Sequence, residues 1–391
     1  MIQRLRRLAH IVALMMRGSW RQPSHVDVLV LFPDGFGTLA SLLDGTTSSV
    51  LDPRERSINN RVALTCLARR RFSAIDYIVE YASRVRPRVM LTFLDNYWPF
   101  YELKSRLPTV TTVAVQNGVR GPSDDVFGHA MTAPRESIAS WHVDHMCVFG
   151  PAVGREYAKY VRGNVHRVGS VKNNAVSPSG PSGPLVGYIS TWRGEVAQDR
   201  LVAIHGGSRS ITVGQLYERR DLLVRYLDGY ARSRGSHLLV IGKDATGADR
   251  SHYARILGHD DFEYSLRAGT DSSYRAVDRP RLLVFSSSTL GYEALARGHR
   301  VAAFFTDIEL TASRGERFGW PLNLPDEGPF WTHRYDENRF GEILGDLDAM
   351  SIDEWRTISE PIVSELIVFD DANTTLRSVL HDALTRGTRV N

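Results

Sequence analysis

Eight short runs of consecutive apolar residues constrain the fold of this chain most strongly. Each run ends in a polar or glycine-rich turn and is followed by a stretch with helical spacing. Continuous apolar runs are typical of strands covered on both faces, as in parallel sheets flanked by helices. The repeated strand–helix order predicts a doubly wound α/β fold. The runs are Val26–Phe32, Val89–Leu94, Thr111–Val115 and Met146–Phe149 in the first half, and Leu185–Ile189, Leu238–Ile241, Leu282–Phe285 and Val301–Phe305 in the second.

A low-complexity segment separates the two sets of runs. Residues 177–184 are only Ser, Pro and Gly, which cannot continue a helix or a central strand. We therefore predict a linker at 177–184 between Rossmann-like domains at 21–176 and 185–340. The spacing after about Asn338 is helical, so helices are expected over 341–391. Two parallel sheets facing a cleft, with C-terminal helices, describe the GT-B architecture of glycosyltransferases and also some nucleotide-sugar epimerases.

Composition excludes several classes of protein. The 391 residues are 42% apolar and 24% charged with a net charge of +4, which is typical of a globular protein and not of a disordered, collagen-like or coiled-coil chain. The charge is interpreted as spread along the chain, with no arm basic enough for nucleic acid. Two cysteines, Cys66 and Cys147, are too few for a disulfide framework and fit the reducing cytoplasm. No window approaches the ~18 apolar residues of a membrane span.

The first 20 residues predict a basic amphipathic helix. Apolar residues recur at helical spacing beside arginines, namely Leu5, Leu8, Val12 and Met15 with Arg4, Arg6 and Arg7. Such a helix can lie on the anionic inner face of the cytoplasmic membrane. The alternative is an ordinary first helix packed on the domain. Peripheral membrane contact is therefore one of two open interpretations.

A run of hydroxyl residues follows the strand expected at Leu282–Phe285. Free N–H groups and the positive dipole end of the next helix form an anion site, and nearby hydroxyls can donate to a phosphate. Glu293 lies one turn beyond Thr289 and can accept hydrogen bonds from ribose hydroxyls. The alternative is a serine-capped helix that binds nothing. The predicted nucleotide-binding residues here are Ser286, Ser287, Ser288, Thr289, Gly291 and Glu293.

Two further strand ends in the second half are expected to reach the same phosphate. Ligands of open α/β sheets bind at the carboxyl ends of the strands. Arg193 and Lys243 can offset the charge of a departing nucleotide, although either can equally be a solvated surface charge. The predicted residues are Ser190, Thr191, Arg193, Gly242 and Lys243.

In the first half, polar residues at strand ends predict the acceptor wall of the cleft. Asp95 is the first candidate for the base that takes a proton from an acceptor hydroxyl, and His129 is the second. The alternatives are a helix N-cap or Asx turn at Asp95 and a structural role for the histidine. Gln116 and Arg120 are expected to bind a sugar hydroxyl and a carboxylate. Asn96 and Asn117 complete the predicted substrate site, although Asn117 with the following glycine is also a turn signal.

The sequence predicts no metal site. His142, Asp144, His145 and Cys147 straddle the start of a strand, where alternate residues face opposite sides. The aspartates at 124, 125, 346 and 348 are interpreted as loop and helix charges. There is no phosphate-binding Gly-x-x-x-x-Gly-Lys-Ser/Thr loop and no Gly-x-Ser-x-Gly elbow, so the sequence argues against ATPase and serine hydrolase chemistry.

These motifs resemble those of the bacterial surface-carbohydrate (O-antigen) biosynthesis proteins, over most of residues 26–360. The hydroxyl-rich turn is also similar, more distantly, to that of capsule Kdo transferases and bacterial sialyltransferases, where it holds the CMP phosphate. Those families have a His-Pro pair where this chain has Gly242 and Lys243. The motifs of the O-antigen family correspond here to Thr92–Asn96, Gln116–Arg120, 272–274, Ser287–Gly298, Phe318–Pro321 and Gly328–Trp331.

The resemblance implies a GT-B glycosyltransferase, and the residues themselves predict that it needs neither metal nor cofactor. Its donor would be a nucleotide sugar, such as a CMP-activated nonulosonate or Kdo-like acid, and its acceptor a glycan or lipid-linked glycan. Two alternatives stay open at this point. One is a nucleotide-sugar epimerase of the same fold, and the other is a non-catalytic glycan-assembly protein.

Overall fold

The computed structural model describes residues 15, 16, 18–54, 58–71, 73–122, 125–192, 194, 199–204, 209–243, 245–307, 310 and 317–386. Most of the predicted N-terminal helix and Arg193 lie outside these residues. In the described part of the chain, no helix combines the length and apolarity that crossing a bilayer requires.

The first domain is built on a six-stranded parallel sheet within the described residues. Its strand order is β2-β1-β3-β4-β5-β6, and every neighbouring pair is parallel. The strands are β1 (Val28–Leu31), β2 (Ser48–Leu51), β3 (Val89–Thr92), β4 (Thr111–Val115), β5 (His142–Val148) and β6 (Arg162–Arg167). The helices are α2 (Phe36–Ala40), α3 (Asn60–Ala68), α4 (Ala74–Val85), η1 (Trp98–Glu102), α5 (Leu103–Arg106), α6 (Asp125–Thr132), α7 (Arg135–Ala139), α8 (Pro151–Ala158) and α9 (Val171–Asn174).

The second domain has its own parallel sheet of six described strands, in the order β11-β10-β7-β12-β13-β14. A short antiparallel pair, β8 with β9, stands apart from it. The strands are β7 (Val186–Ile189), β8 (Leu201–Ile204), β9 (Arg209–Thr212), β10 (Leu238–Ile241), β11 (Glu263–Ser265), β12 (Leu282–Phe285), β13 (Val301–Phe304) and β14 (Trp331–Thr332). The helices are α10 (Val213–Arg232), α11 (Ala248–Leu257), α12 (Thr270–Val277) and α13 (Thr289–Ala296).

The eight predicted apolar runs form the central strands of these two sheets, which confirms the predicted α/β fold. In β1, β3, β7, β10, β12 and β13 every residue is buried, as expected for strands covered on both faces. Helix starts follow local capping rules. In α10, for example, the Thr212 hydroxyl accepts from the Gln215 N–H while the Gln215 side chain accepts from the Thr212 N–H.

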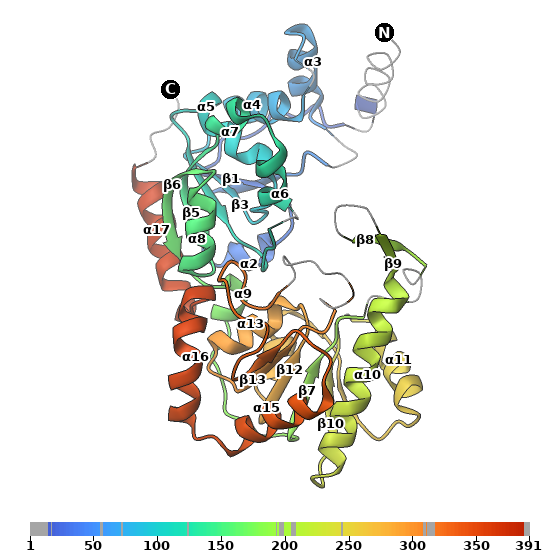
Figure 1. The fold of residues 1–391 in the computed structure, drawn as a ribbon. Coiled ribbons are helices and arrows are strands. Elements are labelled where there is room, and N and C mark those ends of the chain that lie inside the picture. Colours follow the sequence, from blue (N-terminus) through green and yellow to red (C-terminus); the bar gives the residue numbers. More distant parts are fainter. Residues whose placement is uncertain are drawn as a thin grey trace.

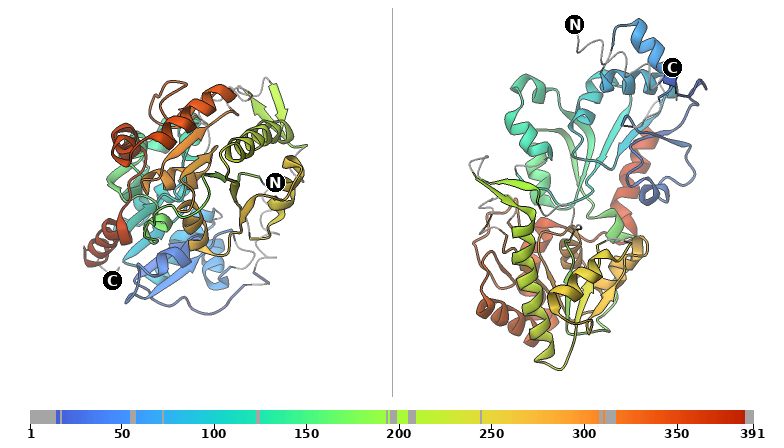
Figure 2. Two further views of the ribbon diagram at one scale, coloured as in Figure 1. Left: turned by 90° about the horizontal axis from the view of Figure 1, so that it is seen from below. Right: turned by 90° about the vertical axis from the view of Figure 1, so that its right-hand side faces the viewer.

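The C-terminal segment contributes helices to both domains (Figures 1 and 2). Phe340 and Leu344 of α15 belong to the core of the second domain. Leu376 and Leu380 of α17 instead pack in the core under the first sheet. The chain therefore crosses back to the first domain through α16, and these helices join the two domains along one side. The segment comprises α15 (Glu337–Ala349), α16 (Ile352–Leu366), η5 (Asp371–Asn373) and α17 (Thr374–Arg386).

Candidate functional site

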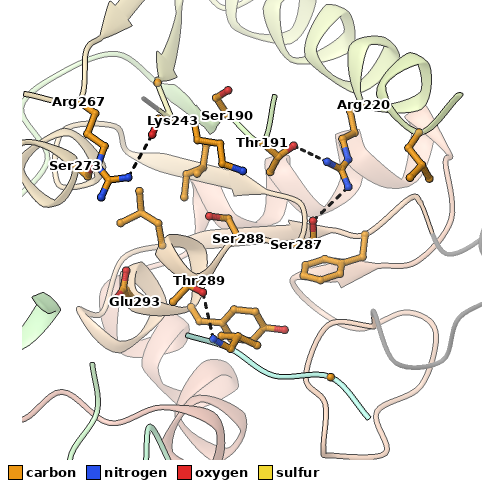
Figure 3. A pocket seen from close by; sticks show the side chains of 18 of the residues that line it. Ser190, Thr191, Arg220, Lys243, Arg267, Ser273, Ser287, Ser288, Thr289 and Glu293 are labelled. Carbon is orange, nitrogen blue, oxygen red and sulfur yellow. Dashed lines mark hydrogen bonds between the residues drawn. The ribbon is translucent and has the colours of Figure 1, made fainter. Parts of the chain in front are cut away.

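A cavity of about 960 Å³ lies between the two domains (Figure 3). Its walls are loops that follow β4 in the first sheet and β7, β10 and β12 in the second, which are the strand ends where α/β sheets bind ligands. Much of the predicted site meets here. The predicted residues that line the cavity are Asn117, Arg120, Ser190, Thr191, Gly242, Lys243, Ser287, Ser288, Thr289 and Glu293.

The hydroxyl-rich turn presents two of its serines to the cavity. Ser287 has a φ of +51°, a left-handed conformation that a residue other than glycine seldom adopts. Ser288 is the N-cap of α13, yet its side chain makes no capping hydrogen bond. The turn thus places two hydroxyls and the start of a helix at one point of the cavity wall (Figure 3). A residue held in such a conformation costs about 1–3 kcal/mol, and residues of this kind cluster at ligand-binding sites.

Ser286 and Gly291, in and just after the hydroxyl-rich turn, have structural roles, which corrects their predicted role in nucleotide binding. The Ser286 hydroxyl donates to the Phe304 carbonyl at 2.7 Å and is buried between neighbouring strands. A Cβ at Gly291 would lie 2.1 Å from the Phe285 ring, so glycine is required there for the helix to pack on the sheet. Gly298 has a φ of +84° after the end of α13, as expected for a residue that terminates a helix.

Thr289 joins the two domains. Its hydroxyl oxygen accepts a hydrogen bond from the Val119 N–H at 3.2 Å, and Val119 belongs to the loop after β4 of the first domain. The start of α13 is therefore adjacent to the predicted acceptor wall.

Glu293 is a buried acid that faces the same cavity. The Ser170 hydroxyl and the Tyr274 hydroxyl, the latter at 3.1 Å, both donate to Oε1. Burial raises the pKa of Glu293 above its ordinary value of 4.5, although these hydrogen bonds oppose the shift.

Replacing Glu293 with Gln is expected to raise stability at neutral pH. The native state holds the Glu293 proton to a higher pH than the unfolded chain does. The contribution of Glu293 to the unfolding free energy is therefore complete below about pH 4.5 and falls as the pH rises through the native pKa. Because glutamine does not ionise, the Glu293→Gln variant does not lose this part of its unfolding free energy as the pH rises. Melting temperatures of both proteins from pH 4 to 8 would diverge with rising pH; parallel curves would contradict the prediction.

The loops after β7 and β10 complete the second-domain wall. The Tyr253 hydroxyl donates to Ser190 Oγ at 2.9 Å, which fixes that loop against α11. A Cβ at Gly242 would lie 2.2 Å from the Tyr264 hydroxyl oxygen, so a side chain does not fit there. The Lys243 N–H donates to Asp249 Oδ2 at 3.1 Å, and its side chain lines the cavity.

Arg220 of α10 was missed by sequence reasoning, and it links the site residues. Its Nε donates to Asp307 Oδ2 at 2.7 Å. Its two terminal nitrogens donate to Thr191 Oγ1 at 2.9 Å and to Ser287 Oγ at 3.4 Å (Figure 3). Burial alone would lower the pKa of Arg220, but the adjacent Asp307 carboxylate raises it, so the guanidinium stays charged. In the sequence this residue is one of two consecutive arginines in an amphipathic helix, and no motif marks it.

Basic residues predominate in the lining of the cavity, although three of them are paired with aspartates that do not line it. Glu293, with its raised pKa, is the single acidic residue among the described lining residues, so an anionic ligand is favoured. The basic residues that line the cavity are Arg120, Lys172, Arg200, Arg220, Lys243, Arg267 and Arg317.

The burial of Asp95 argues against its predicted role as the base that takes a proton from an acceptor hydroxyl. The side chain is fully buried. Its carboxylate accepts from Arg120 Nε at 2.8 Å, from the Tyr157 hydroxyl at 2.5 Å and from the Asn117 N–H at 3.1 Å. No acceptor hydroxyl can reach a carboxylate so enclosed. Asp95 instead fixes the loop that brings Asn117 and Arg120 to the cavity.

Three other predicted residues of the first domain lie outside the cavity lining. His129 stacks on Trp98, with ring centroids 4.2 Å apart, and so belongs to an aromatic cluster. Gln116 is buried and braces its own loop, because it accepts from the Phe149 N–H and donates to the Gly118 carbonyl, both at 2.8 Å. Asn96 is partly buried and follows Asp95 in the chain. These placements favour structural roles over contact with a substrate.

The described residues contain no group of three or more His, Cys, Asp or Glu side chains able to hold a metal ion. Of the residues considered from the sequence, Asp144 pairs with Lys104 at 2.8 Å and His145 lies 3.0 Å from His166. Cys147 is buried in the sheet, and burial raises its pKa to about 12.

Solved structures share this two-domain fold at low sequence identity. A "putative UDP-N-acetylglucosamine 2-epimerase" from Listeria monocytogenes matches with a TM-score of 0.52 and 11% identity over 91% of this chain and 95% of its own. The wall teichoic acid polymerase TagF with CDPG gives 0.50 and 11%, over 98% of each chain. A glycosyltransferase from Rickettsia africae gives 0.50 and 10%, over 94% and 99%. These likenesses show that the chain has the GT-B fold.

Sequence comparison identifies the family. No curated protein matches the chain. The model of one protein family, described as "putative O-antigen biosynthesis protein", matches residues 113–384. The match includes the Gln116–Arg120 loop and the whole hydroxyl-rich turn. With more than half of its length matched, the chain belongs to this O-antigen biosynthesis family.

Proposed function

We propose that this protein is a GT-B glycosyltransferase that moves a sugar from a nucleotide-activated donor onto a glycan or lipid-linked acceptor during surface-carbohydrate synthesis. One observation carries the proposal. The turn Ser287–Thr289 at the start of α13 opens into the electropositive cavity between the domains. A phosphate placed there would meet helix N–H groups, two hydroxyls and nearby cations together.

The same geometry supports a role in stabilising the leaving group. As the sugar departs, negative charge grows on the phosphate that stays with the nucleotide. Arg220 and Lys243 both line the cavity, and Arg220 touches Ser287 of the turn. Fixed cations and a helix start can stabilise such charge without a metal ion. We accordingly propose a reaction that needs no metal and no cofactor.

We further propose a CMP-activated acidic sugar as the donor. Figure 3 places Arg220 on one side of the Ser287–Thr289 turn and Lys243 with Arg267 on the other. Cations on both sides suit a donor with two separated anionic groups, one phosphate and one sugar carboxylate. Glu293 lies beyond the turn, where it can accept from a ribose. Since Asp95 holds Arg120 and Arg220 is placed at the phosphate, Arg267 across the turn replaces Arg120 as the proposed partner of the donor carboxylate.

A nucleotide panel tests the donor class. Thermal unfolding would be measured with CMP, UDP and GDP at one concentration, since a ligand that binds the native state raises the melting temperature by mass action. The largest rise is expected with CMP. A larger rise with UDP would overturn the CMP assignment, and no rise with any nucleotide would overturn the proposed function.

Neighbouring serines provide a matched pair of variants. Ser288→Ala removes a hydroxyl at the cavity and is expected to weaken CMP binding about tenfold, the usual effect of losing a hydrogen bond to a charged group. Ser286→Ala removes a hydroxyl that donates to the Phe304 carbonyl, so it is expected to lower stability and spare affinity. Calorimetric titration of both variants would show this difference. Equal affinities would exclude Ser288 from the site.

The epimerase alternative is favoured by one observation, the TM-score of 0.52 to the Listeria structure. An epimerase would convert a UDP-sugar without an acceptor. Incubation of the protein with UDP-N-acetylglucosamine alone, followed by proton NMR of the sugar, distinguishes the two. An epimerised sugar would support the alternative, whereas the transferase leaves the configuration of the donor unchanged.

A further inference from the structure

Two segments near the start of the chain contain several arginines and no acidic residue. Residues 1–26 include five arginines and residues 58–71 include four, and neither segment has an Asp or Glu. Because the whole chain has a net charge of +4 and these segments contribute +9, the rest of the chain carries −5. Each of these two segments is therefore strongly basic by itself.

The fold joins the two segments. Asn60 Nδ2 donates to the Met15 carbonyl at 2.9 Å, and Arg61 Nε donates to the Trp20 carbonyl at 2.8 Å. A backbone bridge also links Ser19 to Asn59. We call residues 15, 16, 18–21 and 58–71 the arginine-rich arm. It contains α3, which projects from the end of the first domain that lies away from the second (Figure 1).

The arm also exposes large apolar side chains. Met16 is 79% exposed, Trp20 58% and Leu64 44%. Helix α3 packs Val62, Ala63 and Cys66 inward, while Arg61, Leu64 and Ala68 face outward on the opposite side. Arg61 and Leu64 therefore share the outward side of α3, and Arg61 Nε also joins this side to the Trp20 carbonyl.

We propose that the arginine-rich arm docks the protein on an anionic lipid bilayer. Arginines near a membrane are attracted to anionic headgroups, and exposed Trp, Leu and Met side chains insert at the boundary with the acyl chains. Charge alone would equally suit a nucleic acid, but the exposed Trp20, Leu64 and Met16 favour a bilayer. The inference deepens the proposed function, since a lipid-linked acceptor lies in a membrane, but it uses no residue of the nucleotide site.

Vesicle sedimentation with the full chain tests the proposal. Vesicles of phosphatidylcholine alone would be compared with vesicles containing roughly 30% phosphatidylglycerol, at about 0.1 M and 1 M salt. The protein is expected to sediment with the anionic vesicles in low salt and much less in high salt. Equal binding to neutral vesicles would overturn the electrostatic part of the inference.

Two exposed arginine pairs of the first domain give a matched comparison. Arg70→Gln with Arg71→Gln alters the arm and is expected to lower the partition coefficient on anionic vesicles about 30-fold. Arg162→Gln with Arg167→Gln makes the same charge change on the exposed edge strand β6. This pair is expected to change the partition coefficient on anionic vesicles less than threefold. Leu64→Ser should reduce the binding that persists in high salt. Equal losses for the two pairs would show a general charge effect and overturn the assignment to the arm.

Two controls separate this proposal from the others. The CMP-induced thermal shift of the Arg70/Arg71 variant should equal that of the wild type, so loss of vesicle binding with an intact shift concerns the arm alone. Binding to a single-stranded oligonucleotide at low salt, without binding to anionic vesicles, would identify a nucleic-acid surface and overturn the inference.

Discussion

Replacing Arg220 with methionine is expected to weaken binding of the donor nucleotide about 100-fold, because a charge-assisted contact to the ligand and the anchor of Ser287 are lost together. Arg220 contacts Asp307, Thr191 and Ser287, so it orders two loops of the site as well as supplying charge. Methionine keeps much of the side-chain volume and removes the charge. Calorimetric titration with CMP, or with the nucleotide that the panel favours, measures the effect.

Two further variants keep this experiment interpretable. Arg220→Met alone removes the cation that pairs with the buried Asp307 carboxylate, so Arg220→Met with Asp307→Asn restores charge balance and separates lost stability from lost affinity. Arg219→Met is the matched control, since Arg219 lies over the Tyr335 ring at 5.2 Å and does not line the cavity. If the Arg220 and Arg219 variants bound CMP equally well, Arg220 would have no role in the site.

The parts of the fold that could be predicted from the sequence are those in which burial of a strand or helix requires a recognisable pattern of apolar residues. Strands covered on both faces must be apolar throughout, and the predicted bounds of Thr111–Val115, Leu238–Ile241 and Leu282–Phe285 agree with β4, β10 and β12. The edge strand β6 left no such signal because it is almost wholly exposed and contains Arg, Gly, Asn and His. The return of α17 to the first domain was equally hidden, since an apolar helix face does not identify the sheet it covers.

The site was predictable only as positions along the chain. A strand end followed by hydroxyl residues and a helix indicated the turn near Ser288, but not which hydroxyls face the ligand. Ser286 and Ser287 are adjacent, yet one donates to the Phe304 carbonyl and the other lines the cavity. Arg220 lies 67 residues before Ser287, so its place in the site follows from the packing of α10 and not from any local pattern.

Replacing Asp95 with Asn is expected to lower the free energy of unfolding by about 3–5 kcal/mol, the usual cost of breaking a buried ion pair. Arg120, whose side chain is only 8% exposed, would lose its charged partner. Urea unfolding measures the loss. Tyr157→Phe removes one hydrogen bond to the same carboxylate and leaves both charges in place, so a smaller loss of about 1 kcal/mol is expected.

Variants of the Asp95–Arg120 pair also show whether Asp95 is a positioning residue or a catalytic base. If Asp95 fixes the loop through Arg120, Arg120→Met should reduce transfer activity about as much as Asp95→Asn does. The double variant should then be more stable than the sum of the two single losses predicts, because no buried charge stays unpaired. A catalytic base predicts otherwise: Asp95→Asn would abolish transfer with stability intact, whereas Arg120→Met would retain activity. The enclosure of Asp95 by Arg120, Tyr157 and Asn117 favours the first outcome.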